Sequence, residues 1–209
     1  MSNLAIGKSV RSIDSQAFFG CSGLTQVTIP DSVTNLADGP FGIGGPEGAF
    51  CYCDSLTNVI IGKGLAYLGN GTFTSCGNLC SVYFQGNAPP FGAFCNPVCT
   101  NPFFRDTTNT VVYYLPGTTG WSSTYAGQPA LLWNPRPVTD DGSFGLRQNR
   151  FGFNIMGTPN IPLVVEASIA FASGSWLQLQ NCTLTNGLIY FSDPDWTKYG
   201  ARFYRIRSP

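Results

Sequence analysis

The chain has 209 residues, of which 43% are hydrophobic and only 11% are charged, against roughly 25% charged in an ordinary soluble domain. Gly and Pro are plentiful, and aromatic residues make up 14% of the chain. This composition favours β structure with frequent turns and excludes a disordered chain. Eleven basic residues balance eleven acidic ones, so no general attraction for phosphate backbones exists and nucleic acid is excluded as an expected partner.

One sequence pattern repeats from residue 4 to about residue 89. A unit reads Leu-x-x-Val-x-Ile, then Pro or Gly, then Val-x-x-Ile or a Leu variant of it, and it closes on Phe-x-x-Cys. The units from Leu24 and Leu56 are complete, whereas those from Leu4 and Leu79 are not. The first segment predicts a short strand with one apolar face, and the closing segment predicts a short helical or 3₁₀ turn.

Because one unit cannot bury its apolar face alone, the pattern predicts stacked coils that share a continuous core. In such a solenoid, equivalent residues of successive units lie one above another. We therefore expect two ladders, one of aromatic rings and one of thiols, formed by Phe18, Phe50 and Phe73 and by Cys21, Cys53 and Cys76.

An insertion interrupts the second unit. Leu56 and Leu79 are 23 residues apart, whereas Leu24 and Leu56 are 32 apart, and the glycine-rich stretch 42–50 accounts best for the difference. Loops that interrupt one repeat usually emerge on one face, often the binding face. The stretch carries Glu47, which makes that residue a candidate binding residue.

The repeated motif Leu-Thr-x-Val-x-Ile-Pro-x-Ser-Val, followed by Ala-Phe-x-x-Cys, resembles the BspA-type leucine-rich repeat of bacterial surface proteins. Residues 111–121, with Pro116, Gly117 and Trp121, resemble the closing segment of such arrays. The resemblance implies adhesion, protein binding or presentation at the cell surface, hence a secreted or cell-surface location. The chain enters the repeat directly after Met1, Ser2 and Asn3, so this location implies that a leader was removed or that the chain is a fragment.

The rest of the chain predicts a cap and a second module. Residues 91–110 lack a period and predict a loop with Phe103 and Phe104 as an aromatic plug, and residues 117–150 predict a cap that runs into a linker. From Phe151 onward, short alternating segments predict a small β-sandwich-like module that resembles C-terminal modules on secreted proteins of environmental bacteria. The expected fold is thus mainly β, with a repeat solenoid at 1–90, a cap and linker at 91–150, and an all-β module at 151–209.

Histidine is absent, which excludes Ser-His-Asp and Cys-His catalysis and removes the commonest zinc ligand. We expect no cofactor and no metal. Cys95 and Cys99 are candidates for a disulfide, Cys51 and Cys80 could pair with neighbouring coils, and Cys182 is expected in a core. The remaining candidates for acid–base chemistry are carboxylates: Asp140 with Asp141, Asp193 with Asp195, and Glu166. The pair Asp193 and Asp195 flanks a proline and is more typical of a turn than of a calcium site. Glu166 is expected on a polar strand face, and so are Arg202, Arg205 and Arg207.

Exposed aromatic residues are the better functional candidates, because aromatic faces stack on sugar rings or anchor protein partners. The alternative is that most of them are core or cap residues. The candidates are Tyr52, Tyr67, Tyr83, Trp121, Tyr125 and Trp133.

The sequence therefore predicts a non-catalytic secreted or surface protein that binds a protein or glycan through the repeat face and the 42–50 insertion. Two alternatives stay open: a carbohydrate-active hydrolase with an Asp/Glu acid–base pair, and a self-assembling structural protein that forms homo-oligomers. No apolar stretch is long enough to span a membrane.

Overall fold

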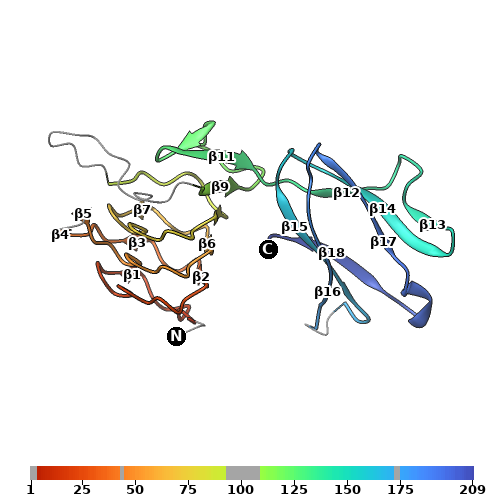
Figure 1. Cartoon of the computed structure of the whole chain (residues 1–209), viewed down its shortest axis with the longest axis horizontal. Helices are drawn as coiled ribbons and strands as arrows, with labels where there is room; N and C mark the ends of the chain where they lie inside the picture. Colours follow the sequence, from red (N-terminus) through yellow and green to blue (C-terminus); the bar gives the residue numbers. More distant parts are fainter. Residues whose placement is uncertain (1–3, 43–44, 93–108, 172–174) are drawn as a thin grey trace. The chain divides into compact units, whose positions relative to one another are not determined.

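The computed structural model describes residues 4–42, 45–92, 109–171 and 175–209. The chain forms two compact units, residues 1–132 and 133–209, and each is described by itself (Figure 1). Both are built from strands, and the one helical segment among the described residues is the 3₁₀ helix η1 (Trp196–Lys198). The expected mainly β composition is therefore confirmed. No described helix has the length and apolar character needed to cross a membrane.

The first unit contains a mostly parallel sheet that gains one strand per coil. Its strands are β2 (Gln26–Ile29), β6 (Asn58–Ile61), β8 (Ser81–Phe84), β9 (Val111–Tyr114), β11 (Gln128–Leu132) and, antiparallel at the edge, β10 (Thr124–Tyr125). Val27, Val59, Val82 and Val112 stand side by side in this register, all buried. The Leu-x-x-Val-x-Ile segments are thus successive strands of one sheet, as their apolar alternation predicted.

A second, narrower sheet lines another side of the same coils. It consists of β1 (Ser12–Ile13), β3 (Asn35–Leu36) and β7 (Tyr67–Leu68), again parallel. Figure 1 shows these strands stacked beside the hairpin β4 (Phe41–Gly42) and β5 (Gly45–Pro46). The residues Ile13, Leu36 and Leu68 point into the core that both sheets share.

The two ladders predicted from the closing segments lie in that core. The rings of Phe18 and Phe50 stack with centroids 5.0 Å apart, and those of Phe50 and Phe73 with centroids 5.7 Å apart. Phe50 and Phe73 are fully buried. The Sγ atom of Cys53 donates to the carbonyl oxygen of Phe18 at 3.2 Å, so the thiols bond the preceding coil.

The closing segments are single turns with i→i+3 hydrogen bonds, the spacing of the short 3₁₀ turn that was one of the two predicted forms. In the second coil, the N–H groups of Cys51 and Cys53 donate within their own turn, to Gly48 O and Phe50 O, both at 3.3 Å. The N–H of Phe50 instead donates to Thr72 O in the next coil, at 2.9 Å. In a helix all these N–H groups would donate within the helix, whereas here alternate N–H groups donate to the neighbouring coil.

An aromatic cluster covers the last coils of the first unit. Trp121 stacks on Tyr114, with centroids 5.1 Å apart and ring planes at 4°, and it also packs on Phe84 and Tyr125. Gly117 has a φ of +82°, which lets the Pro-Gly turn reverse the chain after β9. Trp121 therefore packs at the end of the repeat core, as its place in the closing segment suggested.

The second unit contains two sheets. In the first, β14 (Arg150–Met156) pairs with β12 (Arg136–Val138), β13 (Gly145–Arg147) and β17 (Leu188–Asp193); in the second, β15 (Pro162–Ser168) lies between β16 (Leu177–Thr183) and β18 (Phe203–Arg207). Tyr204 of β18 contacts Phe151, Phe153 and Phe191 of the other sheet. The strands from β14 to β18 lie where sequence alternation placed them.

The division into residues 1–90, 91–150 and 151–209 stays a prediction. The strands of the middle segment are shared between the two units, because β9 to β11 extend the repeat sheet and β12 and β13 pair with β14. The predicted plug, Phe103 and Phe104, lies outside the described residues.

Candidate functional site

A row of solvent-facing polar side chains crosses three coils on the narrow sheet. Ser12 pairs in register with Asn35, and Asn35 pairs with Tyr67, while the residues that follow them point inward. Asn35 Nδ2 donates to Ser12 Oγ at 3.2 Å. We call Ser12, Asn35 and Tyr67 the polar row. Stacking places one such side chain per coil, so a partner would meet them in a straight line.

Asp38 fixes the last member of the polar row. The Tyr67 hydroxyl lies 3.0 Å from each oxygen of the Asp38 carboxylate, and the Asn70 N–H donates to Asp38 Oδ1 at 2.7 Å. Burial raises the pKa of Tyr67, and the hydrogen bond to Asp38 and its charge raise it further. Tyr67 therefore stays a neutral donor at physiological pH, with its ring held against the coil.

The insertion leaves and rejoins the coil at almost one point. The Gly39 N–H donates to Asn70 O at 2.9 Å and the Gly48 N–H donates to Gly71 O at 3.0 Å, so both ends meet consecutive residues of the next coil. Residues 40–47, which lie between these two ends, are therefore eight of the nine extra residues, so the predicted 42–50 lies too far along the chain. A difference in spacing gives the length of an insertion but not its position, and Phe50 is in fact a core residue of the repeat.

We call residues 40–47 the insertion loop. The Glu47 N–H donates to Pro40 O at 3.0 Å and closes its base, and the β4–β5 hairpin lies beyond. The Glu47 carboxylate accepts a hydrogen bond from Gln16 Nε2 at 2.7 Å, which ties the loop to the first coil. The candidate residue Glu47 thus lies at the base of the loop, on the same side of the coils as its hairpin.

The remaining aromatic candidates do not form one face. Tyr52 is half-buried and packs edge-on against Phe19, with centroids 5.3 Å apart. Tyr83 is buried and stacks on Tyr113, so its ring is not open to a ligand. Tyr125 is also buried, and its hydroxyl donates to Pro89 O at 2.9 Å. Burial of Tyr83 and Tyr125 corrects the expectation that they are exposed, because period-two alternation does not reveal what covers the outer face of a strand.

Trp133 lies in the second unit, apart from the other candidates in the contact clustering. Its Nε1 donates to Pro162 O at 2.8 Å, which anchors the start of this unit to β15. Of the predicted residues, Tyr67 therefore belongs to the polar row and Glu47 to the base of the insertion loop. Sequence reasoning missed Asp38, although a polar residue directly after a repeat strand was the available signal.

Comparison with known proteins supports the repeat interpretation of the N-terminal residues. Residues 1–95 match the family model of the BspA-type leucine-rich repeat region. The match contains six copies, where spacing alone had suggested four units. No curated protein and no solved structure matches the chain. The match supports the resemblance seen in the repeat motif over residues 1–95, and such repeats suggest a protein-interaction or surface role.

The thiols of the BspA-type repeats are free. Cys21, Cys51, Cys53 and Cys76 make no disulfide, and neither do Cys80 and Cys182, so the suggested pairing of Cys51 or Cys80 with neighbouring coils is not present. Burial and the nearby charge of Glu47 raise the pKa of Cys51 to about 12. A thiol of that kind is protonated and inert at neutral pH. The predicted pair Cys95 and Cys99 lies outside the described residues.

In the second unit, the acidic candidate Glu166 is bound to two arginines. Arg205 Nε and Arg207 Nε donate to the Glu166 carboxylate at 2.7 and 2.6 Å, and the Glu166 side chain is only 7% exposed. Burial alone would raise the pKa of Glu166, but the hydrogen bonds and charges of Arg207 and Arg205 outweigh it, and the pKa is lowered. Glu166 is therefore buried and paired with two partly exposed arginines, which corrects the expectation that it lies on an open polar strand face.

Asp193 and Asp195 form a turn, as their spacing around Pro194 predicted. The Asp195 N–H donates to Asp193 Oδ1 at 2.9 Å, and the Tyr204 hydroxyl donates to Asp193 Oδ2 at 2.9 Å. The Asp193 carboxylate is 3% exposed and faces the guanidinium of Arg202 at 3.1 Å. Through the contact with Tyr204, Asp193 links β17 to β18.

Proposed function

We propose that this protein is a non-catalytic, secreted or cell-surface binding protein whose repeats form a solenoid and take a protein partner on one side. The side is the one that carries the polar row, Asp38 and the insertion loop. The observation that carries the proposal is the in-register line of Ser12, Asn35 and Tyr67 beside a loop that interrupts one coil only.

Physical arguments favour binding over turnover here. The polar row offers hydroxyl and amide groups held by backbone register and by Asp38, so little side-chain freedom is lost when a partner docks. A loop fixed at both ends by backbone hydrogen bonds adds a second contact beside a rigid surface. The match to BspA-type repeats agrees with a protein partner and with a surface location. The second unit, with its two sheets, would be a sandwich-like module that accompanies the solenoid.

The test uses three variants of the full chain. Residues 41–46 are replaced by one glycine, because Pro40 and Glu47 are already joined by a hydrogen bond. Tyr67→Ala and Asp38→Ala remove the end of the polar row. Thr28→Ala is the matched control, because Thr28 is exposed on the broad sheet, away from the polar row.

Binding is measured by biolayer interferometry against purified envelope and extracellular-matrix proteins, with a glycan array in parallel. We expect a protein ligand whose affinity falls at least tenfold in the loop variant and in Tyr67→Ala, and changes less than twofold in Thr28→Ala. Equal affinity in the wild type, the three test variants and Thr28→Ala would show that this surface does not bind the partner. Binding on the glycan array alone would replace the protein partner with a sugar.

A further inference from the structure

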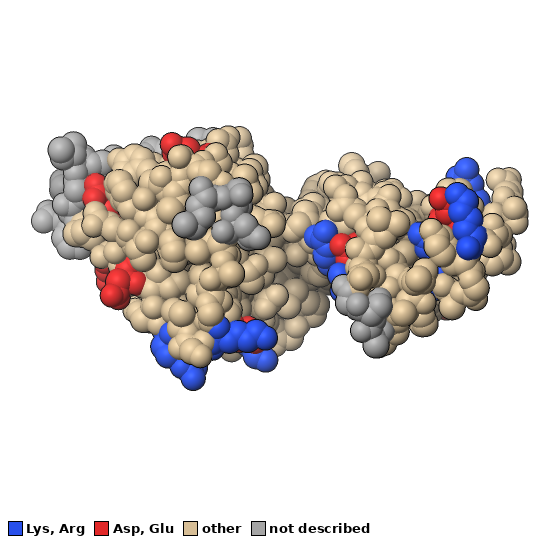
Figure 2. Space-filling view, turned by 90° about the horizontal axis from the view of Figure 1, so that it is seen from below, with Lys and Arg blue, Asp and Glu red and all other residues tan. Residues whose placement is uncertain are grey.

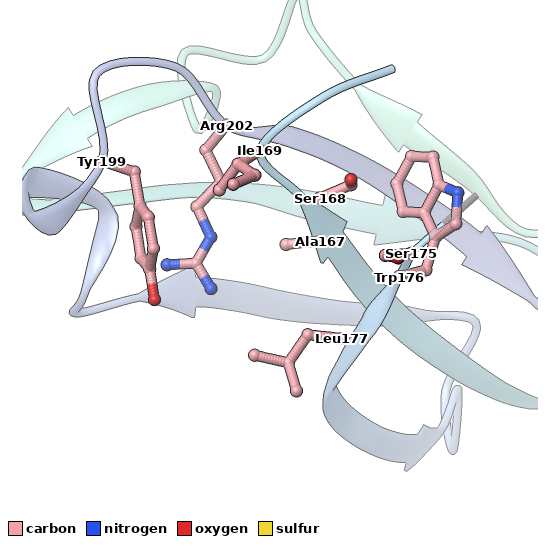
Figure 3. Close-up of a pocket in the computed structure, with 8 residues that line it drawn as sticks. All are labelled: Ala167, Ser168, Ile169, Ser175, Trp176, Leu177, Tyr199 and Arg202. Atoms are coloured by element: carbon pink, nitrogen blue, oxygen red, sulfur yellow. The ribbon is translucent and has the colours of Figure 1, made fainter. Parts of the chain in front are cut away.

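A cavity of about 550 Å³ opens in the second unit between β15, β16 and the segment after η1. Figure 3 shows its lining side chains, with Ile169 and Leu177 on the apolar walls and Tyr199 and Arg202 at one end. Ile169 is 65% exposed and Leu177 is 60% exposed. A volume of several hundred Å³ is the size of a small-molecule site, and apolar walls with one fixed polar group are the usual composition of such a site.

Arg202 is the charged residue in the lining of this cavity. Its side chain is 93% buried, since only 7% of it is exposed, and its guanidinium lies over the Tyr199 ring, 4.2 Å from the centroid. Figure 3 shows the guanidinium standing beside that ring. Packing on Tyr199 and the ion pair with Asp193 hold it in this position, so it would bind a ligand without being ordered first.

The guanidinium has five N–H donors, and its buried Nη1 has no hydrogen-bond partner among the described residues. Its Nη1 is 3.1 Å from Asp193 Oδ2, but this ion pair lacks hydrogen-bond geometry. Asp193 is also shared, because the Tyr204 hydroxyl and the Asp195 N–H donate to it. Buried donors without an acceptor are costly, so an acceptor that enters the cavity is favoured.

Carboxylate is the acceptor that fits a planar, fork-shaped donor best, because two parallel N–H···O bonds form at once. The exposed apolar side chains beside Arg202 add a wall that a hydrated inorganic ion cannot use. We propose that this cavity binds the carboxylate group of a ligand with an apolar body, the carboxylate on Arg202 and the apolar part against Leu177, Ile169 and Tyr199. Small apolar acids carry such a carboxylate, and so does the C-terminus of a polypeptide chain.

The experiment titrates the ¹⁵N-labelled full chain and follows the side-chain N–H signals of Arg202 and Trp176, both of which line the cavity. The probes are 4-phenylbutanoate, its methyl ester, 4-phenylbutylammonium and inorganic phosphate. A hexapeptide that ends in Leu-Phe is added with a free and with an amidated C-terminus. We expect at least one carboxylate probe to bind tenfold or more tightly than its uncharged or amidated counterpart, and phosphate to bind more weakly still.

Two substitutions at matched positions test the place of binding. Leu177→Glu puts a negative charge at the cavity and should weaken carboxylate binding at least tenfold. Leu188→Glu is the control, because Leu188 is also an exposed first residue of a strand, 49% exposed, and does not line the cavity. It should change affinity less than twofold.

Arg202→Gln should abolish carboxylate binding, but it also removes the partner of buried Asp193, so folding is checked by circular dichroism. If that variant unfolds, the comparison of Leu177→Glu with Leu188→Glu shows whether the carboxylate binds in this cavity. Binding of the small acid or of the free peptide supports the proposal and identifies the source of the carboxylate. Equal binding of acid and ester, tighter binding of phosphate, or no binding of either carboxylate probe would overturn it.

Discussion

The Sγ atom of Cys76 lies 3.1 Å from the carbonyl oxygen of Phe50, in the preceding coil, and donates its hydrogen to it. The ring of Phe50 at the same time stacks on that of Phe73. Each closing turn is thus tied to its neighbour twice, by a side-chain hydrogen bond to the backbone and by ring stacking. This double link accounts for the regular spacing of Phe and Cys in the sequence.

Phe50→Ala should destabilise the protein more than any exposed aromatic substitution. Removing a fully buried ring that stacks on Phe18 and Phe73 leaves a cavity, which costs about 3–5 kcal/mol of the free energy of unfolding. Guanidinium denaturation of the full chain measures the loss. Phe19→Ala is the control and should cost less than about 1 kcal/mol, because Phe19 is 45% exposed. Equal losses in the two variants would show that the ladder is not the core.

Thiol reactivity should separate the cysteines. A pKa of about 12 leaves the thiolate fraction of Cys51 at neutral pH about a thousandfold below that of a thiol with the ordinary value of 9.0. The hydrogen bond with Cys53 and burial raise the pKa of Cys76 as well. Cys80 is exposed and should be alkylated first by iodoacetamide, as mapped by peptide mass spectrometry. Labelling of Cys51 and Cys76 should require unfolding; rapid labelling of both in the native protein would contradict their placement.

Stability of the second unit should fall in acid because of Glu166. Its folded-state pKa is lowered from 4.5, so its contribution is fully present above that value and is lost as the pH falls toward the folded-state pKa. Glu166→Gln should cost about 2 kcal/mol at neutral pH, less than a fully buried pair, since the Arg205 and Arg207 side chains are 45% and 40% exposed. Thermal unfolding between pH 3 and pH 7 measures this. An unchanged pH dependence in Glu166→Gln would assign the acid sensitivity to other carboxylates.

Gly48→Ala should be poorly tolerated. A Cβ at Gly48 would come within 2.5 Å of the Thr72 backbone nitrogen, so the base of the insertion loop would have to separate from the next coil. Such overpacking costs about 1–3 kcal/mol. Gly77→Ala is the control, because a Cβ there meets nothing within 4 Å and its backbone is not left-handed. Denaturant midpoints of the two variants give the comparison, and matching midpoints would refute the close approach.

The repeats could be predicted because their signal is periodic: Val27, Val59 and Val82 recur at one position of each unit, and stacking turns that recurrence into adjacency. The position of the insertion could not be predicted, because the spacing between Leu24 and Leu56 does not show where a loop leaves the coil. Backbone hydrogen bonds of Gly39 and Gly48 place it.

The side-chain clusters of the second unit were also beyond the sequence. Alternation treats Glu166 as a polar residue on an open face, but β15 is a central strand whose other neighbour brings Arg205 directly opposite Glu166. Arg202 and Asp193 meet in the same way, from strands or segments that only the fold brings together. A pattern within one strand contains no information on its partner strand, and these contacts depend on the partner.

The closed base of the insertion loop has a consequence for how such proteins change. Its ends meet consecutive residues of the next coil and are hydrogen-bonded to each other, so the segment between them can be exchanged as one piece. Peptides of other lengths grafted between Pro40 and Glu47 would leave the pitch of the stack unaltered. Recognition could thus diversify at this one position while the scaffold below is conserved.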